Sequence, residues 1–516
     1  MLQRPESSPG RRWIVTGTCV EAVLVNMCGH PYRFPRQITQ ADQNTLRRFL
    51  ILLLLTLIAI KIAILVGRGP AAIQADARGY WELSSVVMRG DVLMMGEKIA
   101  YRTPGYPAFL AIVRLLSGSS LLAIIVLQAA MFLGIAWMAA AMAARISQHS
   151  WAKVTTLAIM LPGISSVVYV GAVLSETLFV FLLMLNLTMV MNYTKYKTST
   201  SAVLVGLTFA LTLLTRPIIL LLWVAHVVLL GLVQLHRNRT VFGGVSLSGP
   251  LGHIALAFAV VMVMVMPWLV RNHLIFDKPF LTEFLGRNIW IVTFQDGSGA
   301  GLELPETQAA ETLKRRLSNV SAQGDWSDIN WRHTWTVSNS LVKSGLNDAQ
   351  TDQLMKTVAW QAMKRNTSAA RYKALRRVAN FWRCPATDLP QPEPDFEGFG
   401  TYPSTWQFSV PGVTTGLTKA QEFRASQSVL ANTIIAGIIL LACIFLICWE
   451  PTRHYGVWIA LILAYFCTVT GLVEIPDYRY RMIVEPIAAM TIGSAVTILW
   501  SRWRRIETDL FMEIDH

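Results

Sequence analysis

Long apolar runs alternate with short polar segments along most of the chain. A helix needs roughly 20 apolar residues to cross a bilayer, and about ten runs reach or approach that length. They are predicted at 49–66, 119–144, 152–170, 173–192, 201–215, 217–235, 251–270, 429–449, 456–474 and 482–500. The pattern predicts an all-α, polytopic membrane protein with about ten transmembrane helices.

The positive charges between these runs support one orientation. With the N-terminus in the cytoplasm, every inner connection carries Lys or Arg, as the positive-inside rule requires. These residues are Arg47, Arg48, Arg145, Lys153, Lys195, Lys197, Arg237, Arg239, Arg453, Arg502, Arg504 and Arg505. Two long segments, 67–118 and 272–428, then face out of the cytoplasm.

The same reading divides the chain into five parts. We expect a mobile cytoplasmic tail, an N-terminal transmembrane module that includes the first outer loop (67–118), an outer loop domain, a C-terminal transmembrane module and a second cytoplasmic tail. Their ranges are 1–45, 46–271, 272–428, 429–501 and 502–516.

Both long outer segments contain candidate helices. Residues 106–116 are apolar but short, which predicts an interfacial or re-entrant helix whose Arg114 snorkels to the headgroups. Residues 363–382 form a basic amphipathic helix in a mainly α-helical outer domain. This helix either lies on anionic headgroups or packs on the rest of that domain.

Composition agrees with membrane insertion. The chain is 53% hydrophobic and 15% charged, whereas a soluble domain carries about a quarter charged residues. The net charge of +14 is explained by the basic inner connections, so we expect no nucleic-acid partner. The 6 cysteines show no metal-ligand spacing and no disulfide framework.

Charged residues also gather on the outer side, where the positive-inside bias does not place arginines. Ionisable groups at span ends are costly without a partner or a task. They are Asp76, Asp91, Glu97, Lys98, Arg102, Glu176, Arg216, Arg271, Asp477, Arg479, Arg481 and Glu485. An outward cavity with these groups would suit a lipid-anchored phosphate, which the planar arginine fork matches, and a carboxylate there could deprotonate a hydroxyl.

Each of these residues also has a simpler interpretation. Arg216 and Arg271 could snorkel to headgroups, and Glu176 could stabilise the first turn of its helix. Asp91 and Glu97 could be solvated loop charges. Arg479 and Arg481 lie among Tyr478 and Tyr480 on a short loop and could be interfacial anchors.

An ordered set of segments resembles a known family. Asp76 and Tyr80 are followed by RTPGYPAFLAIVRLLSG, SETLFVFLL, GLTFALTLLTRP, PWLVRN, NFW and PDYRYRMIVEP. In this order they resemble the bacterial branch of the GT-C glycosyltransferases, which includes dolichyl-phosphate-mannose protein mannosyltransferases and the aminoarabinose transferase of lipid A. The resemblance covers about 50–500 and is weak for the substrate.

The resemblance implies a glycosyltransferase in the bacterial inner membrane that acts on the periplasmic face. It implies a polyprenyl-phosphate sugar donor, a lipid, glycan or protein acceptor, contact with membrane lipids and an inverting reaction. Asp76 corresponds to the catalytic base. Many relatives carry a second acid directly after it, whereas this chain has Ala77, so we expect no metal and no cofactor.

The remaining roles follow from that assignment. We expect Arg271, Arg479, Arg216 and Arg481 to bind the donor phosphate, and Glu176, Tyr80 and Tyr478 to position the substrates. The competing hypotheses are a transporter or flippase for a lipid-linked or anionic substrate, and a non-enzymatic scaffold of an envelope assembly. Matching halves and interrupted helices, which many transporters show, are not visible in the sequence.

Overall fold

A computed structural model describes residues 44–45, 47–53, 55–56, 58–59, 76–160, 169–240, 248–296, 302–383, 411–476 and 478–514. For residues 234–240, 248–250, 411–429, 478 and 504–514 the description covers the backbone alone. The described part is helical and contains no strand, which confirms the predicted helical class. Of the predicted tail 1–45 only residues 44–45 are described, and of the first span, 49–66, only 49–53, 55–56 and 58–59.

The N-terminal half contains the helices that carry most of the predicted spans. In chain order they are α3 (Asp76–Met88), α4 (Gly105–Ser117), α5 (Leu121–Ser147), α6 (Ala152–Met160), α8 (Glu176–Tyr196), α9 (Ser199–Thr215), η1 (Pro217–Ile219), α10 (Leu222–Thr240) and α11 (Ser248–Phe276). Side-chain oxygens cap several of them: Ser120 caps α5, and Thr198 forms a capping box with Ser201 at α9.

The C-terminal half begins with short helices and ends with long ones. They are α12 (Leu285–Trp290), η2 (Ile291–Gln295), α13 (Gln308–Ser318), η3 (Trp326–Asp328), α14 (Thr334–Lys343), α15 (Asp348–Arg365), α16 (Thr367–Arg383), α17 (Pro411–Cys448), η5 (Glu450–Thr452), α18 (Arg453–Val473), α19 (Tyr478–Arg481) and α20 (Glu485–Ile514).

Five helical stretches of the described residues are long and apolar enough to cross a membrane. They are Leu121–Ser147, Glu176–Tyr196, Leu251–Phe276, Leu430–Cys448 and Glu450–Val473. The predicted runs 201–215 and 217–235 correspond to shorter apolar helices, Ser199–Thr215 and Pro217–Val233. The helices therefore fit a membrane protein, while ten crossings stay a prediction.

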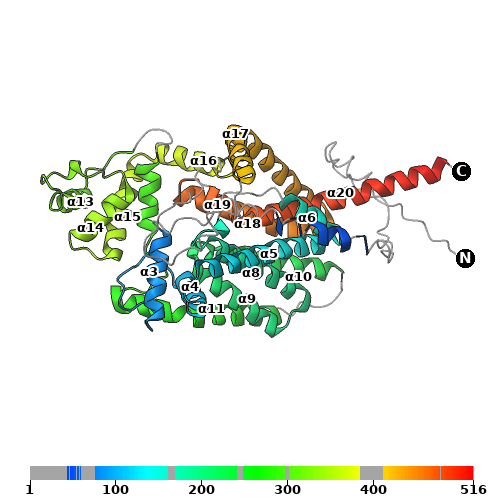
Figure 1. Cartoon of the computed structure of the whole chain (residues 1–516), viewed down its shortest axis with the longest axis horizontal. Helices are drawn as coiled ribbons and strands as arrows, with labels where there is room; N and C mark the ends of the chain where they lie inside the picture. The colour runs from blue at the N-terminus through cyan, green and yellow to red at the C-terminus, as the bar shows by residue number, and fades with distance from the viewer. Residues whose placement is uncertain are drawn as a thin grey trace, which may run out of the picture. The chain divides into compact units, whose positions relative to one another are not determined.

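The apolar helices pack side by side around one large core (Figure 1). Helix α8 contacts α5 and α9, α9 packs on α11, and α20 packs on α5 and α6. Large apolar side chains on the outer faces stay exposed, including Val263 at 72% and Leu441 at 67%. Exposed apolar side chains on such helices are expected to face lipid tails.

A second, smaller core lies within the segment that was predicted to form the outer domain. Trp290, Leu313, Val337, Met355 and Val358 are buried together there by α12, α13, α14 and α15. This core is separate from the one that joins the apolar helices, so the two regions bury apolar surface independently.

The interpretation of Arg114 as a snorkelling residue is wrong. The Arg114 side chain is buried, lies 3.9 Å from the Trp81 ring centroid and donates to the Trp81 carbonyl at 2.9 Å. It also donates to the hydroxyl groups of Ser84 and Ser85. The arginine therefore joins α4 to α3 instead of reaching headgroups.

The predicted helix 363–382 is two helices with a break at Asn366. Two of its basic residues are buried: Lys373 donates to backbone carbonyls, and Arg377 forms an ion pair with Asp296 at 2.6 Å. The structure shows a packed helix, α16, but its main partner is α18, outside the predicted outer domain, and it contacts α15 of that domain less. Tyr372 lies on its exposed side.

Candidate functional site

Two carboxylates and three arginines meet at one end of the apolar helices. Arg479 donates from Nη1 to Asp76 at 2.9 Å and from Nε to Glu176, so it bridges the two acids. Arg216 forms an ion pair with Glu176 at 3.0 Å, and Arg102 pairs with Asp76 at 3.0 Å. We call these five residues the acid–arginine cluster.

The cluster is assembled from helix ends that are far apart in the sequence. Asp76 and Glu176 are the first residues of α3 and α8, where the helix dipole favours an acid. Arg216 follows the last residue of α9, and Arg479 lies in α19, after α18. Helix α8 starts where α9 ends, so the two meet at the same end of the bundle.

Aromatic and hydroxyl groups line the cluster. The Arg102 guanidinium carbon lies 4.2 Å from the centroid of the Tyr80 ring, within the range of a cation–π contact. The Tyr80 hydroxyl is 3.3 Å from the Ser175 hydroxyl, and its ring packs edge-on against Tyr106. Tyr80, predicted to position substrate, is thus next to the cluster.

The two carboxylates differ in their access to solvent. The Glu176 side chain is fully buried, whereas 38% of the Asp76 side chain is exposed. Burial raises the pKa of Asp76, but Arg479 and Arg102 outweigh it and lower that pKa below its usual value. Asp76 is therefore an ionised carboxylate at neutral pH, and it is the acid that an incoming molecule can reach.

A third acid, Glu474, lies beside the cluster. It follows the end of α18, and its charged neighbours are Arg479, Arg216 and Asp76. Burial raises the pKa of Glu474 to about 7, although a hydrogen bond with Tyr480 and both arginines lower it. Glu474 can therefore exchange a proton near neutral pH, which is the property that acid–base catalysis needs.

The charges of the cluster favour an anion. Three guanidinium groups face two ion-paired carboxylates, which leaves one positive charge when Glu474 is protonated. Two buried atoms, Arg102 Nε and Glu176 Oε2, have no hydrogen-bond partner among the described residues. An unsatisfied buried polar atom costs about 1–3 kcal/mol, so a polar ligand with both donors and acceptors would be stabilised here.

The structure does not bring Arg271 to this cluster. Its guanidinium donates to the carbonyl oxygens of Met94 at 2.8 Å and Ile99 at 3.1 Å, and to that of Glu97. Its neighbouring acids are Asp91 and Glu97, and its side chain is buried. The expected role of Arg271 in binding a donor phosphate therefore has no geometric support, and neither does the alternative of snorkelling to headgroups.

The other predicted residues have different outcomes. Arg481 donates to the Trp382 carbonyl at 3.1 Å and lies 3.7 Å from Glu485, so it contacts α16 and α20. The side chain of Tyr478 lies outside the described residues. Asp91 accepts the backbone N–H groups of Met95 and Gly96 at a partly exposed position, which is consistent with a solvated loop charge that also caps the loop.

No described group of three or more His, Cys, Asp and Glu side chains is arranged to hold a metal ion. The residue after Asp76, Ala77, is buried in the apolar core beneath α3, so no second acid is present at this position. Arg479 lies between Asp76 and Glu176, the two acids of the cluster.

No known family model, curated protein or solved structure matches the chain. The assignment of a function therefore depends on the geometry of the cluster and on the resemblance of the sequence segments to the GT-C glycosyltransferases.

Sequence reasoning gave no role to Arg102, Ser175 or Glu474. Arg102 was visible as a charge on the outer side, in RTPGYP, and Glu474 as the acid that ends an apolar run. Neither position shows which partner the side chain meets, because that partner lies on a different helix. Ser175 carries no such signal.

Proposed function

We propose that the chain is a multi-pass glycosyltransferase of the GT-C type in the inner membrane. It moves a sugar from a polyprenyl-phosphate donor to a lipid, glycan or protein acceptor on the periplasmic face, with about ten transmembrane helices. The observation that carries this proposal is the acid–arginine cluster: a partly exposed carboxylate held between arginines, at one end of apolar helices.

The donor phosphate binds through the arginines of the cluster. Arg479 and Arg216 have planar guanidinium groups, which match phosphate oxygens. Asp76 is the carboxylate that a sugar or acceptor hydroxyl can reach, because 38% of its side chain is exposed, whereas the Glu176 side chain is fully buried. A partly exposed carboxylate beside arginines suits a molecule that is anionic at one end and hydroxylated at the other.

In the reaction, the acceptor hydroxyl attacks the anomeric carbon of the sugar. The new bond forms from the acceptor oxygen to that carbon while the bond from carbon to phosphate oxygen breaks, and its electron pair leaves with polyprenyl phosphate. Asp76 accepts the hydroxyl proton. The arginines stabilise the charge that grows on the leaving phosphate.

The ion pairs of Asp76 do not oppose this role. A bound phosphate competes with Asp76 for Arg479, and it adds a negative charge near the carboxylate. Both effects raise the pKa of Asp76 relative to the free protein, because a like charge disfavours ionisation. Donor binding therefore makes Asp76 a stronger base when the acceptor is to be deprotonated.

The test is sugar transfer by the purified full-length protein in detergent, with polyprenyl-phosphate sugars as donors. Asp76→Asn should express normally and lose about 100- to 10,000-fold of turnover, the usual contribution of a positioned base. Activity near that of the wild type would exclude Asp76 as the base. Transfer in detergent needs no sealed compartment, so it also separates this proposal from transport.

The acceptor and the sugar can be identified together. Mass spectrometry of lipid A, envelope glycans and secreted proteins, from cells with and without the gene, should show one component that loses a fixed sugar mass. If no component changes mass while an anionic lipid accumulates on one side of the membrane, transport replaces transfer as the function.

A further inference from the structure

The segment between α3 and α4 is fixed by hydrogen bonds from side chains to its backbone groups. Asp91 accepts two of its N–H groups, and Arg271 donates to three of its carbonyl oxygens, those of Met94, Glu97 and Ile99. Because Arg271 is on α11, the segment is fastened to an apolar helix by a side chain that is 1% exposed. Its course is thus fixed before it reaches Arg102.

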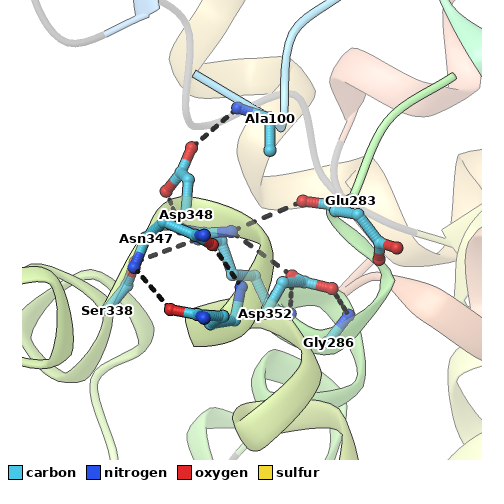
Figure 2. A network of polar contacts seen from close by, with 9 residues as sticks. Ala100, Glu283, Gly286, Ser338, Asn347, Asp348 and Asp352 are labelled. Atoms are coloured by element: carbon cyan, nitrogen blue, oxygen red, sulfur yellow. Dashed lines mark hydrogen bonds and ion pairs between the residues drawn. The ribbon is translucent and has the colours of Figure 1, made fainter. Parts of the chain in front are cut away.

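Ala100 is the point where this segment meets helices α12 to α16 of the segment 272–428, which we call the outer helices. Its N–H donates to Asp348 Oδ2 at 2.9 Å (Figure 2). Its carbonyl oxygen accepts the N–H of Glu283 at 2.9 Å. Asp348 is the first residue of α15, and its side chain also pairs with Arg287 of α12. The Asp348 carboxylate therefore accepts from one donor of the first loop and from one donor of the outer helices.

The outer partner of Asp348 is itself rigidly placed. Arg287 is 1% exposed, donates to Ser338 at 2.9 Å and faces Asp352, one turn after Asp348 on α15. Asp352 accepts the N–H groups of Gly286 at 2.7 Å and of Arg287 at 2.9 Å (Figure 2). A Cβ at Gly286 would lie 1.9 Å from the Asp352 carbonyl oxygen, so α12 packs on α15 as closely as glycine allows.

Arg102 lies two residues after Ala100. It donates to Asp76 at 3.0 Å, and the next residue, Thr103, donates to the Thr215 carbonyl at 3.0 Å. Arg102 is therefore placed between two anchors, one on α15 and one at the end of α9. Of these two, the anchor at Ala100 depends on the outer helices.

We propose that Asp348 is a positioning residue of the candidate site: by holding Ala100, it fixes Arg102 against Asp76. Asp348 thereby links the outer helices to the acid–arginine cluster, whereas Asp352 accepts, among the described residues, only from Gly286 and Arg287 and holds α12 on α15. The inference rests on the proposed function for its kinetic consequence, whereas its structural consequence can be tested without it.

Asp348→Asn and Asp352→Asn form a matched pair of variants. Each acid accepts from at least two donors, and asparagine has one oxygen, so each variant leaves one donor of the same network unsatisfied. Of the two acids, Asp348 is the one that contacts the first loop. Both variants should unfold at a lower temperature than the wild type, and only Asp348→Asn should alter the segment 91–103.

Hydrogen exchange of the full-length protein provides the first measurement. In Asp348→Asn, the amides of 91–103 should exchange about tenfold faster or more, since they lose an anchor and open locally. In Asp352→Asn, the same amides should exchange as in the wild type. Equal exchange in both variants would overturn the proposal.

A double-mutant cycle of Asp348→Asn with Asp76→Asn provides the second measurement. If Asp348 places Arg102 against Asp76, the changes in unfolding temperature should be non-additive, because the two sites are coupled. The cycle of Asp352→Asn with Asp76→Asn should be additive. Additive changes in unfolding temperature in the first cycle would show that Asp348 stabilises the fold without positioning Arg102.

Sugar transfer is the third measurement. The kcat of Asp348→Asn should fall about 10- to 100-fold, as expected for a small displacement of catalytic groups, while Asp352→Asn keeps the wild-type kcat. An unchanged kcat in Asp348→Asn overturns the kinetic role. If the wild type transfers no sugar at all, the proposed function fails, and the exchange and cycle measurements still decide whether Asp348 positions Arg102.

Discussion

Glu176 is the residue on which the cluster depends most for stability. Its side chain is fully buried and pairs with Arg216 and Arg479, which come from different parts of the chain. An ion pair in such a place contributes little net energy when intact, but removing one partner leaves buried charges unpaired. The acid therefore fixes the geometry of both arginines.

Glu176→Gln should destabilise the protein by about 3 kcal/mol, because two arginines lose a buried counter-charge. Denaturant unfolding of the protein in detergent micelles measures this change. Glu303→Gln is the control: Glu303 pairs with Arg332 at 2.8 Å, and 73% of its side chain is exposed, so this pair should contribute almost nothing. Equal effects of the two substitutions would contradict the burial of Glu176.

Glu474 should make stability depend on pH. Its folded pKa of about 7 lies above the ordinary glutamate value of 4.5, so the folded state binds the proton more tightly than the unfolded state does. The contribution of Glu474 to the free energy of unfolding is largest below about pH 4.5. It falls as the pH rises toward 7 and is constant above that. The loss amounts to about 3 kcal/mol over this window.

The measurement is thermal unfolding of the wild type and Glu474→Gln between pH 4.5 and 8. Glutamine does not titrate, so the stability of the variant relative to the wild type should increase through this window and then level off. A constant difference across the window would show that Glu474 has an ordinary pKa. In the transfer assay, the rate of sugar transfer by the wild type should change with pH around pH 7, whereas the rate of the variant should not.

Residue patterns predicted part of this site and missed part of it. Asp76, Glu176, Arg216 and Arg479 stood out because charges at span ends need partners, and the structure brings them together. Arg271 stood out for the same reason but meets backbone carbonyls of the first loop. A sequence shows that a buried arginine needs acceptors; it does not show whether they are carboxylates or carbonyls.

Helices α4 and α9 meet at the cluster with little space between them. A Cβ at Gly105, the first residue of α4, would lie 2.6 Å from the Leu214 carbonyl oxygen near the end of α9. The hydrogen bond from Thr103 to the Thr215 carbonyl joins the same two elements. The glycine therefore allows the segment that carries Arg102 to approach the segment that carries Arg216.

Gly105→Ala should separate these helices and destabilise the protein by about 1–3 kcal/mol, the usual cost of overpacking. It should also lower sugar transfer, because Arg102 and Arg216 move apart. Gly231→Ala in α10 is the control: nothing lies within 4 Å of its Cβ, and alanine favours a helix more than glycine does. Loss of stability in the control alone would refute the close approach.

Helix type was easier to predict than helix packing. Runs of apolar residues identify α5, α8 and α11 because soluble domains rarely contain an apolar stretch long enough to span a bilayer. The division between α15 and α16 was missed, since the helical spacing of apolar residues continues across Asn366. Which basic residues of α16 are buried depends on Asp296, a partner outside the helix.

The cluster and the basic connections together predict a sidedness for the described helices. Helix α8 begins at Glu176 in the cluster and ends at Tyr196. A 21-residue helix is about 30 Å long, which matches the hydrocarbon core of a bilayer. The connection between α8 and α9 should thus lie on the opposite side of the membrane from the cluster. Lys195, in the last turn of α8, and Lys197, in the connection, fit the cytoplasmic side.

Cysteine labelling tests this arrangement on the intact protein. Ala322 and Thr200 are both exposed; one lies among the outer helices and the other just after the connection between α8 and α9. In a background without the 6 native cysteines, Ala322→Cys should react with a membrane-impermeant maleimide added from the periplasm, whereas Thr200→Cys should react only after the inner membrane is opened. The reverse pattern would place the acid–arginine cluster in the cytoplasm, where periplasmic glycosyl transfer is impossible.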